Sequence, residues 1–201
     1  ENISEKVVND LFYVVETDLK ENVQINSKKD LLVYSYRVAG TVGLMMSKIL
    51  KVKNKEARKG AIDLGIAMQL TNIARDVCED KERNRQYIKP DFFSIQKIIL
   101  DSQVFYEKSF YSISSIPIRS RFSVIVARRV YKKIGDYILK QKSTENYNKA
   151  GKIYVPVFRK IVETILSIFD FIKLLFVKDI NYDNDLNHKI LKEDVNIDER
   201  I

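Results

Sequence analysis

Residues 65–80 read GIAMQLTNIARDVCED and predict one helix with a polar edge. At 3.6 residues per turn, the polar side chains of this stretch fall within roughly an 80° arc. They are Gln69, Asn72, Asp76 and Asp80. Apolar residues border the arc, so these oxygen atoms lie beside the buried face and need water or a cation. Mg²⁺ takes such oxygen ligands together with water and substrate phosphates. The alternative is the solvated edge of an ordinary amphipathic helix.

The rest of the chain predicts an all-α bundle. Only six glycines and three prolines interrupt 201 residues, and no sustained alternation of apolar and polar residues indicates strands. We expect helices at residues 4–20, 29–50, 55–82, 92–112, 118–140 and 155–176. Ser27 and Asn54 are the expected N-caps. Residues 1–178 are expected to form one helical domain and residues 179–201 a polar C-terminal tail, in which His188 has no assigned role.

Composition narrows the class of protein. A hydrophobic content of 45% indicates a globular chain, and a net charge of +8 suits anionic partners such as nucleic acid, an acidic membrane surface or diphosphate. The basic residues are scattered and no zinc-finger or RNA-binding spacing is present, so nucleic acid is not expected. The single cysteine, Cys78, and the absence of a visible signal peptide favour the cytoplasm. Charged residues interrupt the apolar stretch 153–177, so we expect a core helix and not a membrane-spanning one. A side that faces the inner membrane surface is the alternative.

Two longer motifs carry a family resemblance. Residues 34–46 read YSYRVAGTVGLMM, and together with residues 69–80 they closely resemble the phytoene/squalene synthase family, with a third similar segment at residues 100–137. The resemblance covers about residues 14–160 and is closest to the bacterial phytoene synthases. It implies an isoprenoid-synthase-type helical bundle. The first aspartate-rich motif of that family has no counterpart in residues 1–33, so we expect an incomplete bundle, the C-terminal two-thirds of the family fold.

The resemblance also implies a reaction and its ligands. Such prenyltransferases condense two geranylgeranyl diphosphates head to head into phytoene, through a cyclopropylcarbinyl diphosphate, as the first committed step of carotenoid biosynthesis. Mg²⁺ is the expected metal, with Mn²⁺ as a substitute. The implied metal ligands are Asn72, Asp76 and Asp80. The implied diphosphate contacts are Gln69 and Arg75, and the tyrosines implied to approach the diphosphate or the intermediate are Tyr34 and Tyr131.

Three further positions are assigned to substrate binding by the resemblance. Val38 and Gly40 belong to the first motif, and Gly40 has the alternative role of allowing a close helix contact. Lys152 stands where the family pattern has arginine, so it keeps the charge but loses the bidentate fork. For Arg75 the alternative is an ion pair with Glu79, and for the tyrosines it is core packing.

Two other functions remain open at this point. One is a squalene or diapophytoene synthase that uses C15 farnesyl diphosphate. NADPH is not expected, because the chain has no Gly-x-Gly-x-x-Gly fingerprint. The other is a non-catalytic homologue or assembly partner, favoured by the missing aspartate motif. The sequence leaves the oligomeric state open.

Overall fold

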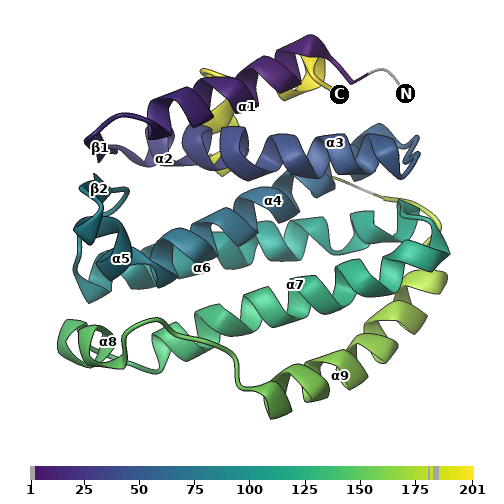
Figure 1. The fold of residues 1–201 in the computed structure, drawn as a ribbon. Coiled ribbons are helices and arrows are strands. Elements are labelled where there is room, and N and C mark those ends of the chain that lie inside the picture. Colours follow the sequence, from purple (N-terminus) through teal and green to yellow (C-terminus); the bar gives the residue numbers. More distant parts are fainter. Residues whose placement is uncertain (1–2, 181, 183–185) are drawn as a thin grey trace.

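A computed structural model describes residues 3–180, 182 and 186–201, and helices make up most of that part of the chain. The long helices are α1 (Glu5–Asp18), α2 (Lys28–Ser35), α3 (Thr41–Ile49), α4 (Lys55–Arg75), α6 (Phe92–Ser109), α7 (Ile118–Leu139) and α9 (Val157–Leu175). In Figure 1 they stack in layers, with α1 above α2 and α3, then α4 and α6, then α7, and α9 below. Helix α4 packs most extensively against α6 and also contacts α3 and α7. The expected all-α bundle is therefore confirmed.

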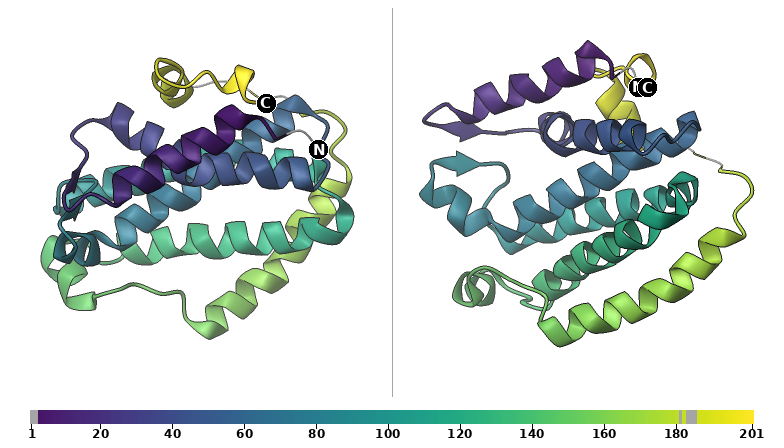
Figure 2. Two further views of the ribbon diagram at one scale, coloured as in Figure 1. Left: turned by 45° about the horizontal axis from the view of Figure 1, so that its top comes forward. Right: turned by 45° about the vertical axis from the view of Figure 1, so that its right-hand side comes forward.

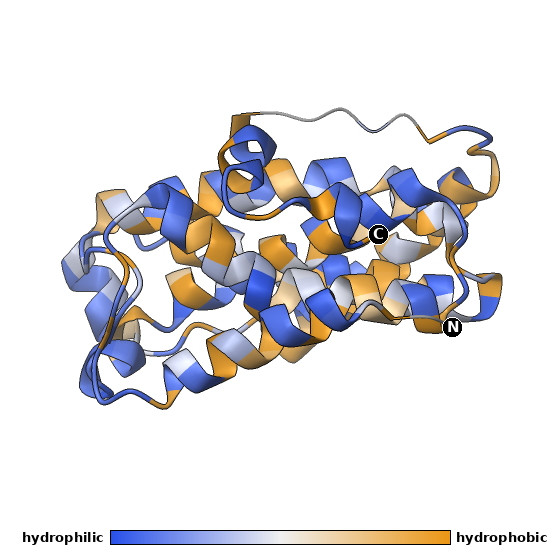
Figure 3. Cartoon of the chain, turned by 90° about the horizontal axis from the view of Figure 1, so that it is seen from above, coloured by the Kyte–Doolittle hydropathy of each residue, from blue (hydrophilic) through white to orange (hydrophobic). Residues whose placement is uncertain are grey.

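Local capping explains where several helices begin. Ser27 Oγ accepts the backbone N–H of Asp30 at 3.0 Å, and Asn54 Oδ1 accepts that of Ala57 at 3.0 Å. Both expected N-caps are confirmed, since each side chain satisfies an amide that the first helical turn leaves free. Apolar and polar residues alternate along the helices, as Figure 3 shows, so each helix has a face to bury.

The helix expected at residues 55–82 is not continuous, which corrects the prediction. It ends at Arg75, and the short helix α5 (Val77–Glu82) follows. Asp76 lies between them with φ −103° and ψ 14°, outside the α-helical region. The four polar residues of the motif are therefore shared between two helices that meet at Asp76.

Several elements were not expected from the sequence. A π-helical turn, η1 (Tyr36–Gly40), joins α2 to α3, so the helix expected at residues 29–50 contains a bulge. Strands β1 (Val23–Gln24) and β2 (Arg85–Gln86) form a short parallel pair. A 3₁₀ turn, η2 (Tyr111–Ser115), follows α6, and α8 (Thr144–Ala150) lies between α7 and α9. Figure 1 places β2, α5 and α8 at the same end of the bundle.

Helix α9 is amphipathic. One side packs on α7, and the other side carries exposed apolar residues such as Phe158, Ile161 and Phe169. Across the described ranges, no helix combines the length and the apolar character needed to cross a bilayer.

Residues 186–201 belong to the packed bundle, not to the polar tail expected for residues 179–201. Helix α10 (Leu186–Lys192) contacts α2, and the 3₁₀ turn η3 (Ile197–Glu199) follows it. Figure 2 shows this segment in yellow beside α1 and α2. Leu191 and Val195 are fully buried in the main core. Buried His188, which had no assigned role, places Nε2 2.9 Å from Asp63 Oδ1 on α4. Residues 181 and 183–185 lie outside the described residues.

We expect Leu191→Ala to lower the free energy of unfolding by about 2–5 kcal/mol, because the truncation leaves a cavity in a packed core. Leu186→Ala in the same helix is the matched control, since Leu186 is 69% exposed, and should cost less than about 0.5 kcal/mol. Urea denaturation of both variants measures the difference. Equal, small effects would mean that the C-terminal segment does not contribute to the core.

Candidate functional site

The charged groups of the expected site meet at the α4–α5 break. Arg75 donates two hydrogen bonds to the Asp76 carboxylate, at 2.8 and 2.6 Å. Lys152, from the segment after α8, lies 3.3 Å from Asp76 Oδ1 and 2.7 Å from Glu79 Oε2. The structure thus brings Lys152 to the motif from a distant part of the chain. The alternative expected for Arg75, an ion pair with Glu79, is not the pair that forms, because Arg75 bonds to Asp76 and Glu79 bonds to Lys152.

The two aspartates have opposite electrostatic environments. Burial raises the pKa of Asp80 to about 6, and the negative charge of Asp76 adds to the shift. Burial also acts on Asp76, but the hydrogen bond and charge of Arg75, helped by Lys152, hold the pKa of Asp76 below its usual value. Protein cations therefore neutralise the Asp76 carboxylate. Burial and the charge of Asp76 disfavour the ionised form of Asp80, which a bound cation would stabilise.

The donor set fits a hard cation in part. Asn72 Oδ1 is buried and has no hydrogen-bond partner among the described residues. A buried oxygen of this kind is costly unless something binds it. Within the described ranges, however, no three His, Cys, Asp or Glu side chains are grouped to hold a metal. Asn72, Asp76 and Asp80 offer oxygen donors of the kind that Mg²⁺ takes together with water and substrate oxygens.

Tyr34 and Tyr131 take different places. The Tyr34 hydroxyl is buried and lies 3.1 Å from Asp18 Oδ2 and 3.0 Å from the hydroxyl of Tyr87. Burial, with the Tyr87 hydrogen bond, raises the pKa of Tyr34, so this hydroxyl keeps its proton. Tyr131 is partly buried against the main core. The hydrogen bond to Asp76 is the main cause of the raised pKa of Arg75, and Tyr131 contributes to it, which places Tyr131 near Arg75.

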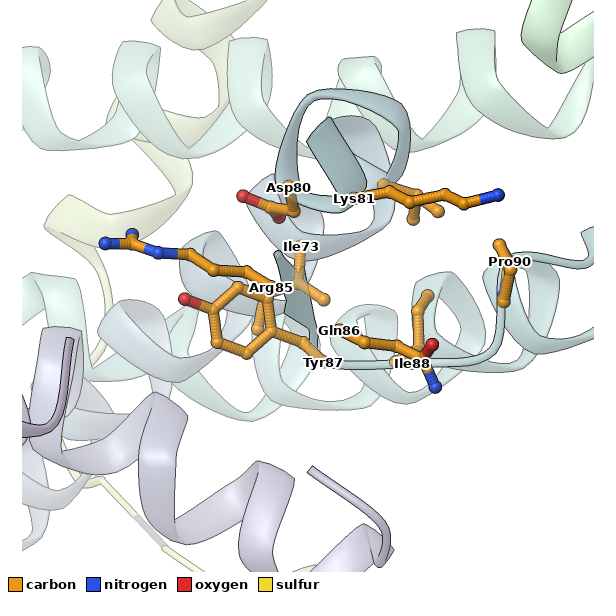
Figure 4. Close-up of a pocket in the computed structure, with 9 residues that line it drawn as sticks. Ile73, Asp80, Lys81, Arg85, Gln86, Tyr87, Ile88 and Pro90 are labelled. Atoms are coloured by element: carbon orange, nitrogen blue, oxygen red, sulfur yellow. The ribbon is translucent and has the colours of Figure 1, made fainter. Parts of the chain in front are cut away.

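Tyr87 and Arg85 were given no role from the sequence. With Asp80 they line a small pocket of about 10 Å³ beside β2, room for about one water molecule. Figure 4 shows the polar ends of Asp80, Arg85 and Tyr87 on the same side of this pocket. Their position directly after the second motif is the signal that could have identified them.

A large apolar cavity, partly open to solvent, lies along α4. It measures about 560 Å³ and is lined mainly by residues of η1, α3, α4, η2 and α7, a size typical of ligand pockets. Val38 and Gln69 are on its wall, and their contact with substrate stays a prediction. Gly40 is not among its lining residues. A Cβ at Gly40 would come within 3.1 Å of Ile62 Cγ2 on α4. In the structure Gly40 therefore has its alternative role, which is to allow a close contact between helices.

Comparisons with known proteins agree with this arrangement. Residues 1–97 match the family model described as squalene/phytoene synthase. The 15-cis-phytoene synthase of Pantoea ananas is 31% identical over 139 residues, which are 59% of this chain and 45% of that protein. These matches support membership of this chain in the squalene/phytoene synthase family. The phytoene synthase of Thermus thermophilus, another similar protein, is 54% identical over 69 residues, 34% of this chain and 24% of its own length.

A solved structure supports the fold of this chain. The crystal structure of a dehydrosqualene synthase in complex with ligand superposes with a TM-score of 0.66 and 25% identity. The match covers 85% of this chain and 66% of that chain. The isoprenoid-synthase type of bundle is therefore confirmed. The chain spans less than half the length of the Pantoea ananas enzyme.

We expect the opposite pKa shifts of the two aspartates to appear in metal-free stability curves. Asp80 binds its proton more tightly in the folded protein, so its ionised form destabilises the fold above about pH 6. Asp80→Asn should therefore raise the unfolding free energy at pH 7.5 by roughly 1 kcal/mol. It should also remove the gain in stability that wild type shows as the pH falls from about 6 towards 3.8.

Asp76→Asn is the matched comparison with the opposite sign. Because the pKa of Asp76 is lowered, its carboxylate stabilises the fold at neutral pH, and that contribution is lost as the pH falls through the lowered value. Urea denaturation from about pH 2.5 to pH 8 measures both variants, a range that extends below the usual carboxyl pKa of 3.8. A loss of stability at pH 7.5 in Asp80→Asn would contradict the assignment.

Proposed function

We propose that the full-length protein is a phytoene synthase, which condenses two geranylgeranyl diphosphates head to head with Mg²⁺ as cofactor. The observation that carries the proposal is that α4 links two features: Gln69 is on the wall of an apolar cavity of about 560 Å³, and Arg75, at the end of the same helix, is in a polar cluster with Asp76 and Lys152. Such a site can bind a diphosphate at one end and a long hydrocarbon along its length. Similarity to enzymes named phytoene synthase favours the C20 substrate.

The residues suit ionisation of an allylic diphosphate. Arg75 and Lys152 supply positive charge for the diphosphate oxygens, and Gln69 adds an amide from the cavity wall. When bound, Mg²⁺ would be held by Asn72, Asp76 and Asp80 and would neutralise charge that develops on the leaving diphosphate.

The cavity and the tyrosines have separate tasks in the proposal. The apolar walls keep water away from the carbocation, which water would otherwise capture. The protonated Tyr34 hydroxyl is hydrogen-bonded to Asp18 and to Tyr87, which lines the small pocket with Asp80, and it is a fixed dipole there. Condensation would pass through a cyclopropylcarbinyl diphosphate before the second ionisation.

A second candidate is a synthase that uses C15 farnesyl diphosphate. The structural similarity to a dehydrosqualene synthase favours it. The two candidates share the polar site and differ in the length of hydrocarbon that the cavity must hold.

Product analysis of the full-length protein tests both. We expect a C40 product from geranylgeranyl diphosphate with Mg²⁺ or Mn²⁺, and no need for NADPH. A C30 product from farnesyl diphosphate alone would support the C15 candidate. No product from either substrate would support a non-catalytic homologue.

Asp76→Asn should lower turnover by about a hundredfold or more, since it removes a carboxylate that would hold the Mg²⁺ needed to neutralise the leaving diphosphate. Its stability should fall by only about 1 kcal/mol. The matched control is Asp101→Asn. Asp101 has a side chain 19% exposed and ion-paired with Lys28 at 2.9 Å, and the Asp76 side chain is 18% exposed. The control should keep its turnover. Parallel losses of metal-free stability and activity in Asp76→Asn would instead indicate a purely structural Asp76.

A further inference from the structure

The α4–α5 break is held by a side chain from α8. Tyr147 is 1% exposed, and its hydroxyl lies 2.9 Å from the carbonyl oxygen of Ala74 and 2.8 Å from that of Arg75. Burial raises the pKa of Tyr147, so the hydroxyl stays protonated and can donate at any physiological pH. These two carbonyls are the last of α4, where a helix needs outside donors.

The backbone ladder continues on both sides of this contact. The Asp76 N–H donates to the Asn72 carbonyl at 2.9 Å, and the Asp80 N–H donates to the Asp76 carbonyl at 2.8 Å. Tyr147 bonds to the carbonyls that lie between these two bonds. It therefore acts where the direction of α5 relative to α4 is set, and this direction places Asp80 relative to Asn72.

Two neighbours of Tyr147 bind the same region. Asn148 Oδ1 accepts the Cys78 thiol of α5 at 3.4 Å. Gly151 ends α8 with φ +61°, a left-handed conformation that favours glycine, and the chain then presents Lys152 to Asp76 and Glu79. Backbone, thiol and carboxylates of the break are thus all contacted from one short segment, residues 147–152.

We propose that Tyr147 is a positioning residue, which holds the α4–α5 break so that Asn72, Asp76 and Asp80 face one ligand together. The proposal rests on the proposed function for the role of these three side chains. Tyr147 itself touches only backbone, so its hydroxyl acts through the geometry of the break.

The test compares Tyr147→Phe with Tyr106→Phe in the full-length protein. Tyr106 is also 1% exposed, and its hydroxyl bonds to α4 as well, but to the Thr71 side chain at 3.1 Å and not to the break. Each variant loses one hydroxyl and keeps its ring. Hydrogen exchange of the Asp76 and Asp80 amides is measured without metal or substrate, relative to the amides of α6.

For Tyr147→Phe we expect exchange at Asp76 and Asp80 to rise about five- to tenfold relative to α6, the effect of one lost buried hydrogen bond. The Mg²⁺ concentration for half-maximal activity should rise about fivefold, with most of the wild-type kcat restored at saturating Mg²⁺. Tyr106→Phe should show neither change. Unchanged exchange at the two amides, or a uniform increase that includes α6, would overturn the proposal.

The two readouts separate this proposal from the proposed function. If wild type makes no product from either prenyl diphosphate, the proposed function fails, and exchange at the two amides still decides whether Tyr147 holds the break. If wild type is active and Tyr147→Phe has the wild-type Mg²⁺ dependence, the positioning role fails while the function stands.

Discussion

The close packing of α4 against η1 and α3 is the constraint on which the rest of the structure depends. A Cβ at Gly43 would overlap the backbone carbonyl of Ala61, and a Cβ at Gly65 would overlap that of Ala39. Each glycine costs about 0.5–1 kcal/mol of helix stability relative to alanine, which the closer packing offsets. With the backbones this near, α4 lies at the centre of the bundle and contacts α3, α6 and α7.

That central position explains why the cavity and the polar site share α4. The small residues that allow the close contact also leave space along α4, and Gly43 and Gly65 are both on the cavity wall. The C-terminal end of the same helix carries Gln69, Asn72 and, at its cap, Asp76. One helix therefore links a hydrocarbon-sized space to a cluster of charges. The C-terminal segment also contacts this helix, through the hydrogen bond between His188 and Asp63.

The charged groups at the α4–α5 break can exchange their ion-pair partners for a bound ligand. Arg75 and Lys152 are both paired with Asp76, and Asp80 is a partly buried carboxylate with a raised pKa. In the function that we propose, a diphosphate takes over the cations and a metal ion takes over the carboxylates, so that no buried charge is left unpaired. Holding such a site in place needs a rigid backbone, and contacts from α8 to the break provide one.

Local patterns determined much of this protein from the sequence alone. Helix periodicity placed most ends of the long helices to within a few residues, apart from the end of α4. Ser27 and Asn54 marked two of the starts, and the two motifs indicated the family by resemblance. These features depend on neighbours within one or two turns. The apolar spacing of Leu191 and Val195 was a similar signal, but polar composition concealed it, and the segment was expected to be a tail.

Tertiary structure alone decided the break at Asp76, the partners of Arg75, and the contacts of Lys152 and Tyr147 with α4 and α5. A helical wheel assumes an unbroken helix, so it could place Asn72, Asp76 and Asp80 on one face but could not show that the helix ends between them. The carbonyls of Ala74 and Arg75 accept a hydroxyl from another helix, and that donor reaches them only because the bundle folds α8 against α4. Sequence spacing determines which groups can share a face, whereas long-range packing determines which groups meet.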